Sequence, residues 1–295
     1  MSAAAEPAGP RPRRLTLSRV GVYVFLVGAS AFFLLPLWAM VLTSLKPMSE
    51  IQQGDLFQLP HTPTFAAWSR AWSHACTGLA CNGISVGFAN SVKILVPSVV
   101  ASIALGALTG YALAFYRVRG GNLVFAILLV GAFIPYQVFI YPLVRIFAWI
   151  GIYGTLTGIV VIHSIFGLPF MTLLFRNYYS SLPRELFNAA RVDGAGFLGI
   201  LRHVILPMST PIVIVAVILQ VTGIWNDFIL GLTFAGLANQ PMTVQLNNVV
   251  ATTQGTVEYD VDMAATILTA ALPLAVYLVS GRWFVRGIAA GAVKG

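Results

Sequence analysis

The sequence predicts an all-α membrane protein with six transmembrane helices. Of its 295 residues, 58% are hydrophobic and only 9% are charged, whereas soluble domains carry about 25% charged residues. Six apolar runs are long enough to cross a hydrocarbon core of about 30 Å, which takes roughly 20 helical residues. The runs are continuous and do not alternate with polar residues, which favours helices over the strands of a closed barrel.

The six predicted spans are separated by short or polar connections. Their bounds are 20–45, 94–116, 123–144, 152–175, 204–226 and 263–281. Several contain proline, which membrane helices tolerate when neighbouring helices satisfy the freed carbonyl groups. The first run is too long for the apolar region of a signal peptide and lacks a small-residue cleavage site. We therefore interpret it as a retained span.

Basic residues set the predicted orientation, because Lys and Arg are enriched in the cytoplasmic flanks of membrane helices. With the N-terminus in the cytoplasm, 13 of the 17 basic residues lie inside and 4 lie outside. The net charge of +8 does not indicate nucleic-acid binding, because the basic residues cluster between apolar runs. We expect a cytoplasmic tail over 1–19, a membrane domain over 20–287 and a second cytoplasmic tail over 288–295.

Three connections are too long to be simple turns. They are the outer segments 46–93 and 236–262 and the cytoplasmic segment 176–203. Both cysteines, Cys76 and Cys81, lie in the first outer segment and show no metal-ligand spacing. Because that compartment is oxidising, we expect them to form a disulfide.

The cytoplasmic connection predicts two short helices with a sharp turn between them. Pro183 suits the first turn of a helix, and Glu185 complements the positive helix end. Asp193 and Gly194 end that helix, since Gly is favoured where the chain turns sharply. A second short helix over 197–203 leads into the next span. Such a knob suits docking into a groove on another protein, and the alternative is a helical loop lying on the membrane surface.

Within this connection, NAARVDGA followed by ILP resembles the EAA-type coupling motif of binding-protein-dependent ABC import permeases. The matching residues are Ala189, Ala190, Asp193, Gly194, Ala195, Ile205, Leu206 and Pro207. Asn188 stands where that family usually has Glu, which removes a carboxylate that could pair with an ATPase subunit. The resemblance implies that this motif, together with Glu185 and Asn188, couples the chain to an ATPase.

Three further stretches narrow the resemblance. GIWNDFILGL at 223–232 and FVRGIAAGAVKG at 284–295 look like carbohydrate-type permeases of the maltose-transporter kind, and IPYQVFIYPLV at 134–144 fits their third helix. The whole looks most like permeases for glucose or mannose. The resemblance implies the type I ABC importer permease fold with both termini cytoplasmic. It also implies a second homologous permease subunit, two ATP-binding subunits and an extracytoplasmic sugar-binding protein.

Motifs for catalysis are absent from the sequence. None of the three lysines, Lys46, Lys93 and Lys294, belongs to a GxxxxGK[ST] phosphate-binding loop. The four histidines form no zinc-type pattern, and no nucleophile–base pair stands out. We therefore expect no catalytic residue, metal or cofactor in this chain, with ATP and Mg²⁺ bound by the partner ATPase subunits.

Two groups of polar and aromatic residues are candidates for a substrate path. Trp225, Asn226 and Asp227 form a cluster at the outer end of the fifth span, and sugars are commonly held by aromatic faces and hydrogen bonds. The alternative role of Asp227 is a structural helix cap. Tyr136 and Gln137 lie in the third span and could line the path, although Gln137 could equally bond to a neighbouring helix.

These observations together predict the permease subunit of an ATP-binding-cassette sugar importer in the bacterial inner membrane. The chain would form half of the translocation path and couple to a separate ATPase through 176–203. The alternative is a secondary transporter driven by an ion gradient. The long helical cytoplasmic connection and the scarcity of intramembrane carboxylates argue against that alternative.

Overall fold

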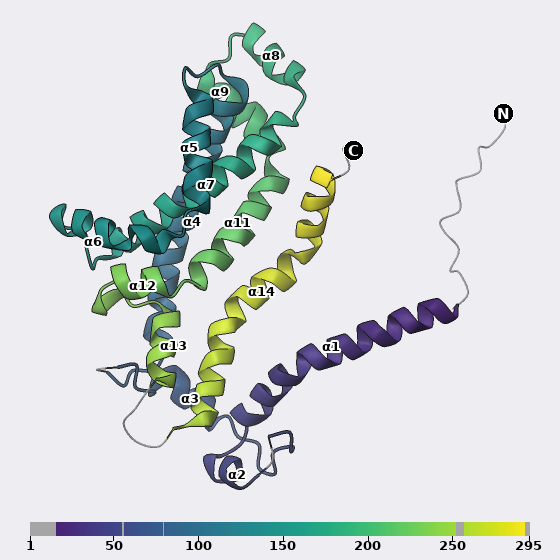
Figure 1. Cartoon of the computed structure of the whole chain (residues 1–295), viewed down its shortest axis with the longest axis vertical. Helices are drawn as coiled ribbons and strands as arrows, with labels where there is room; N and C mark the ends of the chain where they lie inside the picture. The colour runs from purple at the N-terminus through teal and green to yellow at the C-terminus, as the bar shows by residue number, and fades with distance from the viewer. Residues whose placement is uncertain (1–15, 55, 79, 252–256, 293–295) are drawn as a thin grey trace.

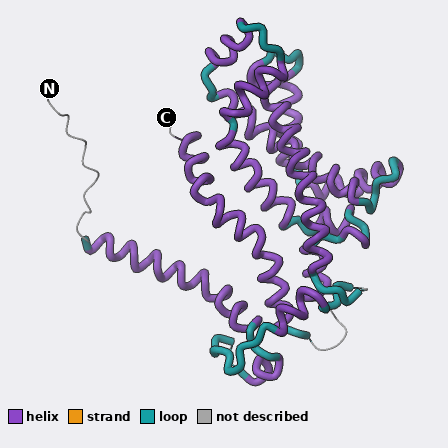
Figure 2. The backbone as a smooth tube through the Cα atoms, turned by 180° about the vertical axis from the view of Figure 1, so that it is seen from behind, coloured by secondary structure: helices purple, strands orange, loops and turns teal. Residues whose placement is uncertain are grey.

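Only helices and connecting segments occur in the described part of the chain (Figures 1 and 2). The structure is a computed structural model that describes residues 16–54, 56–78, 80–251 and 257–292, with side chains as far as residue 281. Most of the expected N-terminal tail and residues 293–295 of the expected C-terminal tail lie outside the described residues. The final helix continues to Ala292, so residues 288–292 of that expected tail are helical.

Four continuous helices are long and apolar enough to cross a membrane. They are α1 (Leu17–Ser44), α4 (Ser85–Phe115), α7 (Leu156–Ser180) and α14 (Tyr259–Ala292). Two further candidate spans are bent. One is α5 (Gly121–Phe133) followed at 99° by η1 (Tyr136–Phe139) and α6 (Ile140–Trp149). The other is Phe197–Met208 followed at 80° by α11 (Thr210–Trp225). The described residues therefore hold four to six candidate spans, at the positions of the six predicted apolar runs.

Proline explains both bends. Proline disfavours the helical conformation of the residue before it, and Ile134, which precedes Pro135, is extended with φ −73° and ψ 127°. At the second bend, Pro211 has no N–H to donate to the carbonyl of Pro207. The Thr210 hydroxyl donates to that carbonyl instead, at 3.2 Å. The prolines inside α1, α4, α7 and α14 are tolerated within continuous helices, as predicted.

Short helices fill the connections between the spans. Those on the expected outer side are α2 (Met48–Gln53), α3 (Ala66–Ser73), α12 (Ile229–Phe234), η3 (Leu237–Asn239) and α13 (Met242–Val250). Those in the connection expected to be cytoplasmic are α8 (Arg184–Val192), α9 (Phe197–Ile200), η2 (Leu201–Ile205) and α10 (Leu206–Met208). The prediction of two short helices around Gly194 agrees with α8 and α9.

The expected outer segment 236–262 contains η3 and α13, and α13 is packed into the body of the molecule. The Met242 amide donates to the Ser91 hydroxyl at 2.8 Å, and the Gly87 amide donates to the Gln245 side-chain oxygen at 2.7 Å. The Asn90 amide nitrogen donates to the carbonyls of Ala238 and Gln240. These bonds tie α13 and η3 to α4. Residues 252–256 of the segment lie outside the described residues.

Small residues let α4 and α7 approach closely. A Cβ atom added at Gly110 would lie 2.8 Å from the backbone nitrogen of Arg176, and one added at Gly106 would collide with Met171. Gly106 and Gly110 form a GxxxG pair, the spacing at which membrane helices commonly pack through their backbones. The closely packed pair of α4 and α7 forms the central part of the molecule (Figure 1).

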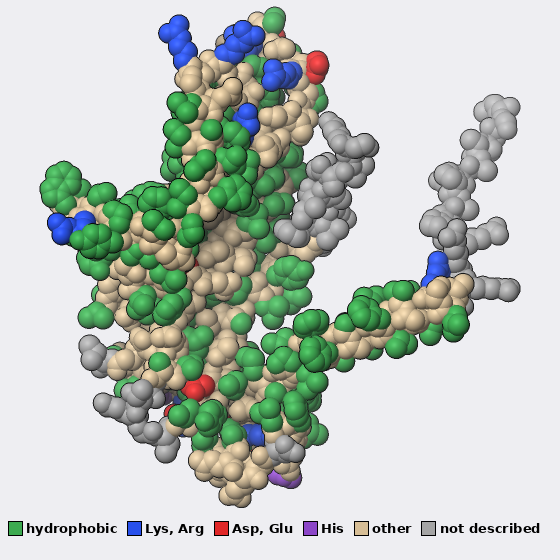
Figure 3. Space-filling view, viewed as in Figure 1, with side chains coloured by type: hydrophobic (Ala, Val, Ile, Leu, Met, Phe, Trp, Pro, Cys, Tyr) green, Lys and Arg blue, Asp and Glu red, His purple; other side chains and the backbone are tan. Residues whose placement is uncertain are grey.

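The two ends of the molecule carry different charges and separate apolar cores. Lys and Arg side chains gather at the end that holds α5, α8 and α9 (Figure 3). At the opposite end, Arg70 of α3 forms ion pairs with Glu258, at 2.6 Å, and with Asp260, at 2.5 Å. All three residues belong to the segments expected outside. The N-terminal helix α1 leaves the body at this same end (Figure 1).

Candidate functional site

The helix α8 lies at the basic end of the molecule and presents most of its surface to the surroundings. Phe187 is its one buried residue, with 4% of its surface exposed. The expected coupling residues Glu185, Asn188 and Ala189 are exposed, and Ala190 is half-buried. The structure therefore leaves the motif face of α8 free to contact another protein, while a single aromatic side chain attaches the helix to the body.

An aromatic cluster beneath α8 receives that side chain. Phe187 stacks on Phe115 with ring centroids 4.7 Å apart and 18° between the planes, and it meets the Tyr116 ring edge-on at 5.5 Å. The Tyr111 ring lies 4.7 Å from that of Phe197, and its hydroxyl donates to the Phe197 carbonyl at 3.2 Å. We call these five residues the aromatic platform. It connects α8 and α9 directly to the C-terminal end of α4.

The turn after α8 requires glycine. Gly194 has φ +81°, in the left-handed region that side chains with a Cβ rarely adopt. Its amide bonds to the Arg191 carbonyl at 3.1 Å, and the Ala195 amide bonds to the Ala190 carbonyl at 2.9 Å. This pair of bonds is the Schellman motif that closes many helices. The motif residues Asp193, Gly194 and Ala195 thus form the turn that orients α8 relative to α9.

The structure brings seven of the eight expected coupling residues together on α8 and its closing turn. The eighth, Pro207, lies in α10 near the bend into α11. Sequence analysis did not identify Phe187 or the rest of the aromatic platform. The available signal was a single aromatic residue in the predicted cytoplasmic helix.

The two groups proposed for a substrate path converge at Asp227, which follows the end of the fifth span. The Asp227 carboxylate accepts a hydrogen bond from the Gly231 amide at 3.0 Å, and the Thr243 hydroxyl donates to the Asp227 carbonyl at 2.7 Å. The Tyr136 side chain also interacts electrostatically with the carboxylate. Burial raises the pKa of the Asp227 carboxyl, while the bonds from the Gly231 and Leu230 amides and the interaction with Tyr136 act in the opposite direction. Asp227 therefore caps the start of α12 and lies within electrostatic reach of Tyr136 at the bend between α5 and α6.

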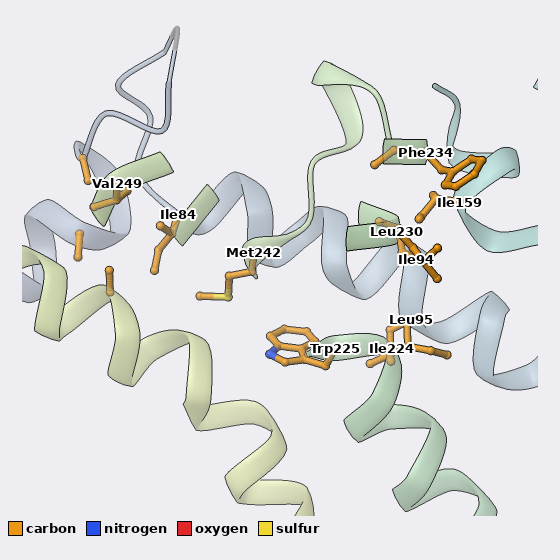
Figure 4. Packing of buried hydrophobic residues seen from close by; sticks show 14 of the residues in the cluster. Ile84, Ile94, Leu95, Ile159, Ile224, Trp225, Leu230, Phe234, Met242 and Val249 are labelled. Carbon is orange, nitrogen blue, oxygen red and sulfur yellow. The ribbon is translucent and has the colours of Figure 1, made fainter. Parts of the chain in front are cut away.

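Trp225 does not face an open path in this conformation. Only 1% of its surface is exposed, and its indole nitrogen donates to the Thr269 carbonyl of α14 at 2.9 Å. Its ring meets Phe88 edge-on at 5.6 Å. Figure 4 shows Trp225 among buried side chains of α4, α11, α12 and α13. Its role here is packing, whereas Gln137 and Asn226 are exposed at the helix breaks.

The two cysteines lie in a short loop between α3 and α4. Cys76 and Cys81 are joined by a disulfide. Within that loop, the Thr77 carbonyl accepts a hydrogen bond from the Asn248 side chain of α13 at 3.0 Å. The loop is therefore held against the same outer helix that pairs with α4.

Comparison with known proteins places this arrangement among transport components. The family model described as binding-protein-dependent transport system inner membrane component matches residues 102–292. A probable ABC transporter permease protein of Pyrococcus horikoshii is 32% identical, over 96% of this chain and 100% of its own length. A xylose/arabinose import permease protein of Haloferax volcanii is 29% identical, with 93% of each chain covered.

The fold also has a solved counterpart. A chain in the crystal structure of a bacterial ABC transporter involved in the import of the acidic polysaccharide alginate superposes with a TM-score of 0.76. The superposition covers 92% of this chain and 99% of that one, at 22% sequence identity. This likeness extends to the overall arrangement of helices described above.

Proposed function

The chain belongs to the family of binding-protein-dependent inner membrane permeases of ABC importers, and we propose that it forms half of a sugar path driven through α8. It is a multi-pass component of the inner membrane. As a permease subunit it is not the ATPase, and ATP is hydrolysed by a separate subunit. Family membership also removes the alternative of a secondary transporter driven by an ion gradient.

The proposal depends mainly on how α8 is attached to the rest of the chain. Its motif face is exposed, its only buried side chain is Phe187, and its closing turn depends on Gly194. A helix held in this way can lie in a groove of an ATPase subunit and still move as one body with the aromatic platform. Closure of the ATPase dimer on ATP would shift α8, and the platform would carry that shift into α4 and its close partner α7.

The proposed assembly contains one further permease subunit, two ATP-binding subunits and an extracytoplasmic binding protein. A binding-protein-dependent component requires an ATPase and a binding protein as partners. The second permease subunit would supply the other side of the path, and two ATPase subunits would drive it. In this assembly ATP and Mg²⁺ are held by the ATPase subunits. The basic end of Figure 3 would then face the cytoplasm.

The proposed substrate is a sugar. A relative covering nearly the whole chain is named for the import of xylose and arabinose. The polar group at the bend of α5 and α6, with Tyr136, Gln137, Asn226 and Asp227, supplies hydroxyl, amide and carboxylate groups that suit hydrogen bonding to sugar hydroxyls. Trp225 supports this region from within the core. A glucose or mannose substrate, which the sequence resemblance implies, stays a prediction.

Reconstitution tests the proposal. The complex of this chain with its permease partner, ATPase and binding protein is placed in vesicles, and uptake of labelled sugars is measured with and without internal ATP. We expect uptake only when ATP and the binding protein are both present. Uptake that follows an imposed sodium or proton gradient in the absence of ATP would contradict the proposal. A panel of pentoses, hexoses and disaccharides bound to the isolated binding protein identifies the substrate independently.

A further inference from the structure

A basic cavity lies beside α8 and against Phe115 and Tyr116 of the aromatic platform, and the proposed coupling mechanism gives no role to its arginines. It has a volume of about 690 Å³ and lies where the α4–α5 connection meets α7 and the start of α8. Arg117, Arg176 and Arg184 line it. Among the described residues, no acidic side chain forms an ion pair with any of these three arginines. The cavity therefore concentrates positive charge that the acidic side chains of the described residues do not neutralise through ion pairs.

The arginines come from three separate segments, and one of them is held in place. The Arg176 guanidinium lies 3.9 Å from the centroid of the Phe125 ring of α5, an arrangement stabilised by attraction between the cation and the ring. The first residues of α5, Gly121 and Leu123 among them, also line the cavity. No acidic residue occupies the first turn of α5 and no side chain caps it. Its positive helix end thus adds to the field of the arginines.

We propose that this cavity binds the phosphate group of an anionic phospholipid from the cytoplasmic leaflet. Arginine forms paired hydrogen bonds with phosphate oxygens, and basic pockets between membrane helices on the cytoplasmic side bind anionic headgroups. The bound headgroup would contact Arg184, the first residue of α8. The content of anionic lipid in the leaflet would in this way influence the position of α8, the helix expected to contact the ATPase.

An exposed apolar face leads away from the cavity and identifies a lipid as the occupant. Leu123 lines the cavity and is 66% exposed, and Ile127 and Val130 on the same helix are 61% and 60% exposed. Positions i, i+4 and i+7 lie on one face of a helix. Acyl chains can therefore lie along α5 while the phosphate enters the cavity. An acidic segment of a protein partner would have no use for this apolar face.

Lipid titration of the purified importer complex tests the proposal. Short-chain phosphatidylglycerol is added to the complete complex in detergent, and the bound lipid is counted by native mass spectrometry, with phosphatidylcholine as the neutral comparison. Arg117→Gln and Arg176→Gln should each weaken phosphatidylglycerol binding by about fivefold. Arg176→Lys keeps the charge but loses the paired hydrogen bonds and the stacking on Phe125, so it should weaken binding, though less than Arg176→Gln. Arg119→Gln is the matched control, because Arg119 lies in the same connection but does not line the cavity.

The outcomes separate the possible occupants. Selective phosphatidylglycerol binding that is lost in the two glutamine variants and kept in the Arg119 control supports the proposal. Equal losses in the control, or unchanged binding in Arg176→Gln, would overturn it. Displacement of the lipid by millimolar inorganic phosphate would assign the cavity to free phosphate instead. Binding that occurs only after the ATPase is stripped away would show that the ATPase occupies the cavity, and this too would overturn the proposal.

Discussion

Replacement of Gly194 by valine tests the coupling turn most selectively. A Cβ added at Gly194 meets no heavy atom within 4 Å, so the substitution introduces no collision inside this chain. The penalty comes from φ +81°, since the left-handed conformation costs residues with a Cβ about 1–2 kcal/mol. If the turn relaxes to avoid this strain, α8 leaves the orientation that fits its partner. The fraction of correctly oriented α8 should then fall by about five- to thirtyfold.

Gly196→Val is the matched control for this experiment. Gly196 lies two residues later in the same turn, and an added Cβ there also meets nothing within 4 Å. Its φ of −77° and ψ of 177° suit any residue. We expect Gly194→Val to insert in the membrane normally but to lose ATP-driven uptake and to retain less ATPase during purification, while Gly196→Val keeps both. Equal uptake by the two variants would refute the reasoning.

Three further predictions concern Phe187, the disulfide and Asp227. Phe187→Ala removes the buried attachment of α8, at a cost of about 3–5 kcal/mol for a fully packed ring, and should speed hydrogen exchange of the α8 amides while the spans stay protected. Mass spectrometry without reduction should find Cys76 and Cys81 joined, and free thiols at both positions would contradict the disulfide. Asp227→Ala leaves the Gly231 amide without its acceptor, which costs about 1–3 kcal/mol, and should lower both uptake and the thermal midpoint. Asp227→Asn keeps an acceptor and should be milder, so equal effects of the two variants would remove the capping role.

The membrane spans could be predicted from the sequence because hydrophobic length is a local property. The first predicted span, 20–45, differs by only a few residues from α1 (Leu17–Ser44). The second began too late, at 94, because polar residues such as Asn90 open α4 and bond across to the segment before α13. Such pairing joins positions about 150 residues apart and leaves no trace in a local hydropathy pattern.

The bends and the outer helices were harder to predict for a related reason. Pro135 was recognised inside a span, but proline is tolerated in α1, α4, α7 and α14 and breaks the third span. The outcome depends on whether neighbouring groups satisfy the freed carbonyls, which requires the packed structure. The segment that forms α13 carries Thr243, Gln245, Asn247 and Asn248, and these polar residues hide its packing from a hydropathy pattern. In the fold, that glutamine accepts a bond from the Gly87 amide.

The coupling residues could be predicted from the motif, whereas the contacts that attach α8 to the rest of the chain could not. Asp193 and Gly194 marked the end of a helix, and the Schellman turn agrees with that prediction. The stacking of Phe187 on Phe115 joins two segments separated by two membrane helices. In the substrate region, the sequence suggested Trp225 as a path residue, but the indole bonds to Thr269 across the core. An aromatic residue beside polar ones has the same local pattern in both roles.

The central claim is that α8 lies against the ATPase, and site-directed crosslinking measures it most directly. Two variants are made in a chain whose native cysteines are replaced by serine. One is Asn188→Cys on α8, and the other is Trp149→Cys at the exposed C-terminal end of α6. A short cysteine-to-lysine crosslinker is then added to the complete complex. The account predicts that position 188 crosslinks to the ATPase subunit, that position 149 does not, and that ATP changes the yield only at 188. Full ATP-driven uptake by a complex in which position 188 never reaches the ATPase would contradict it.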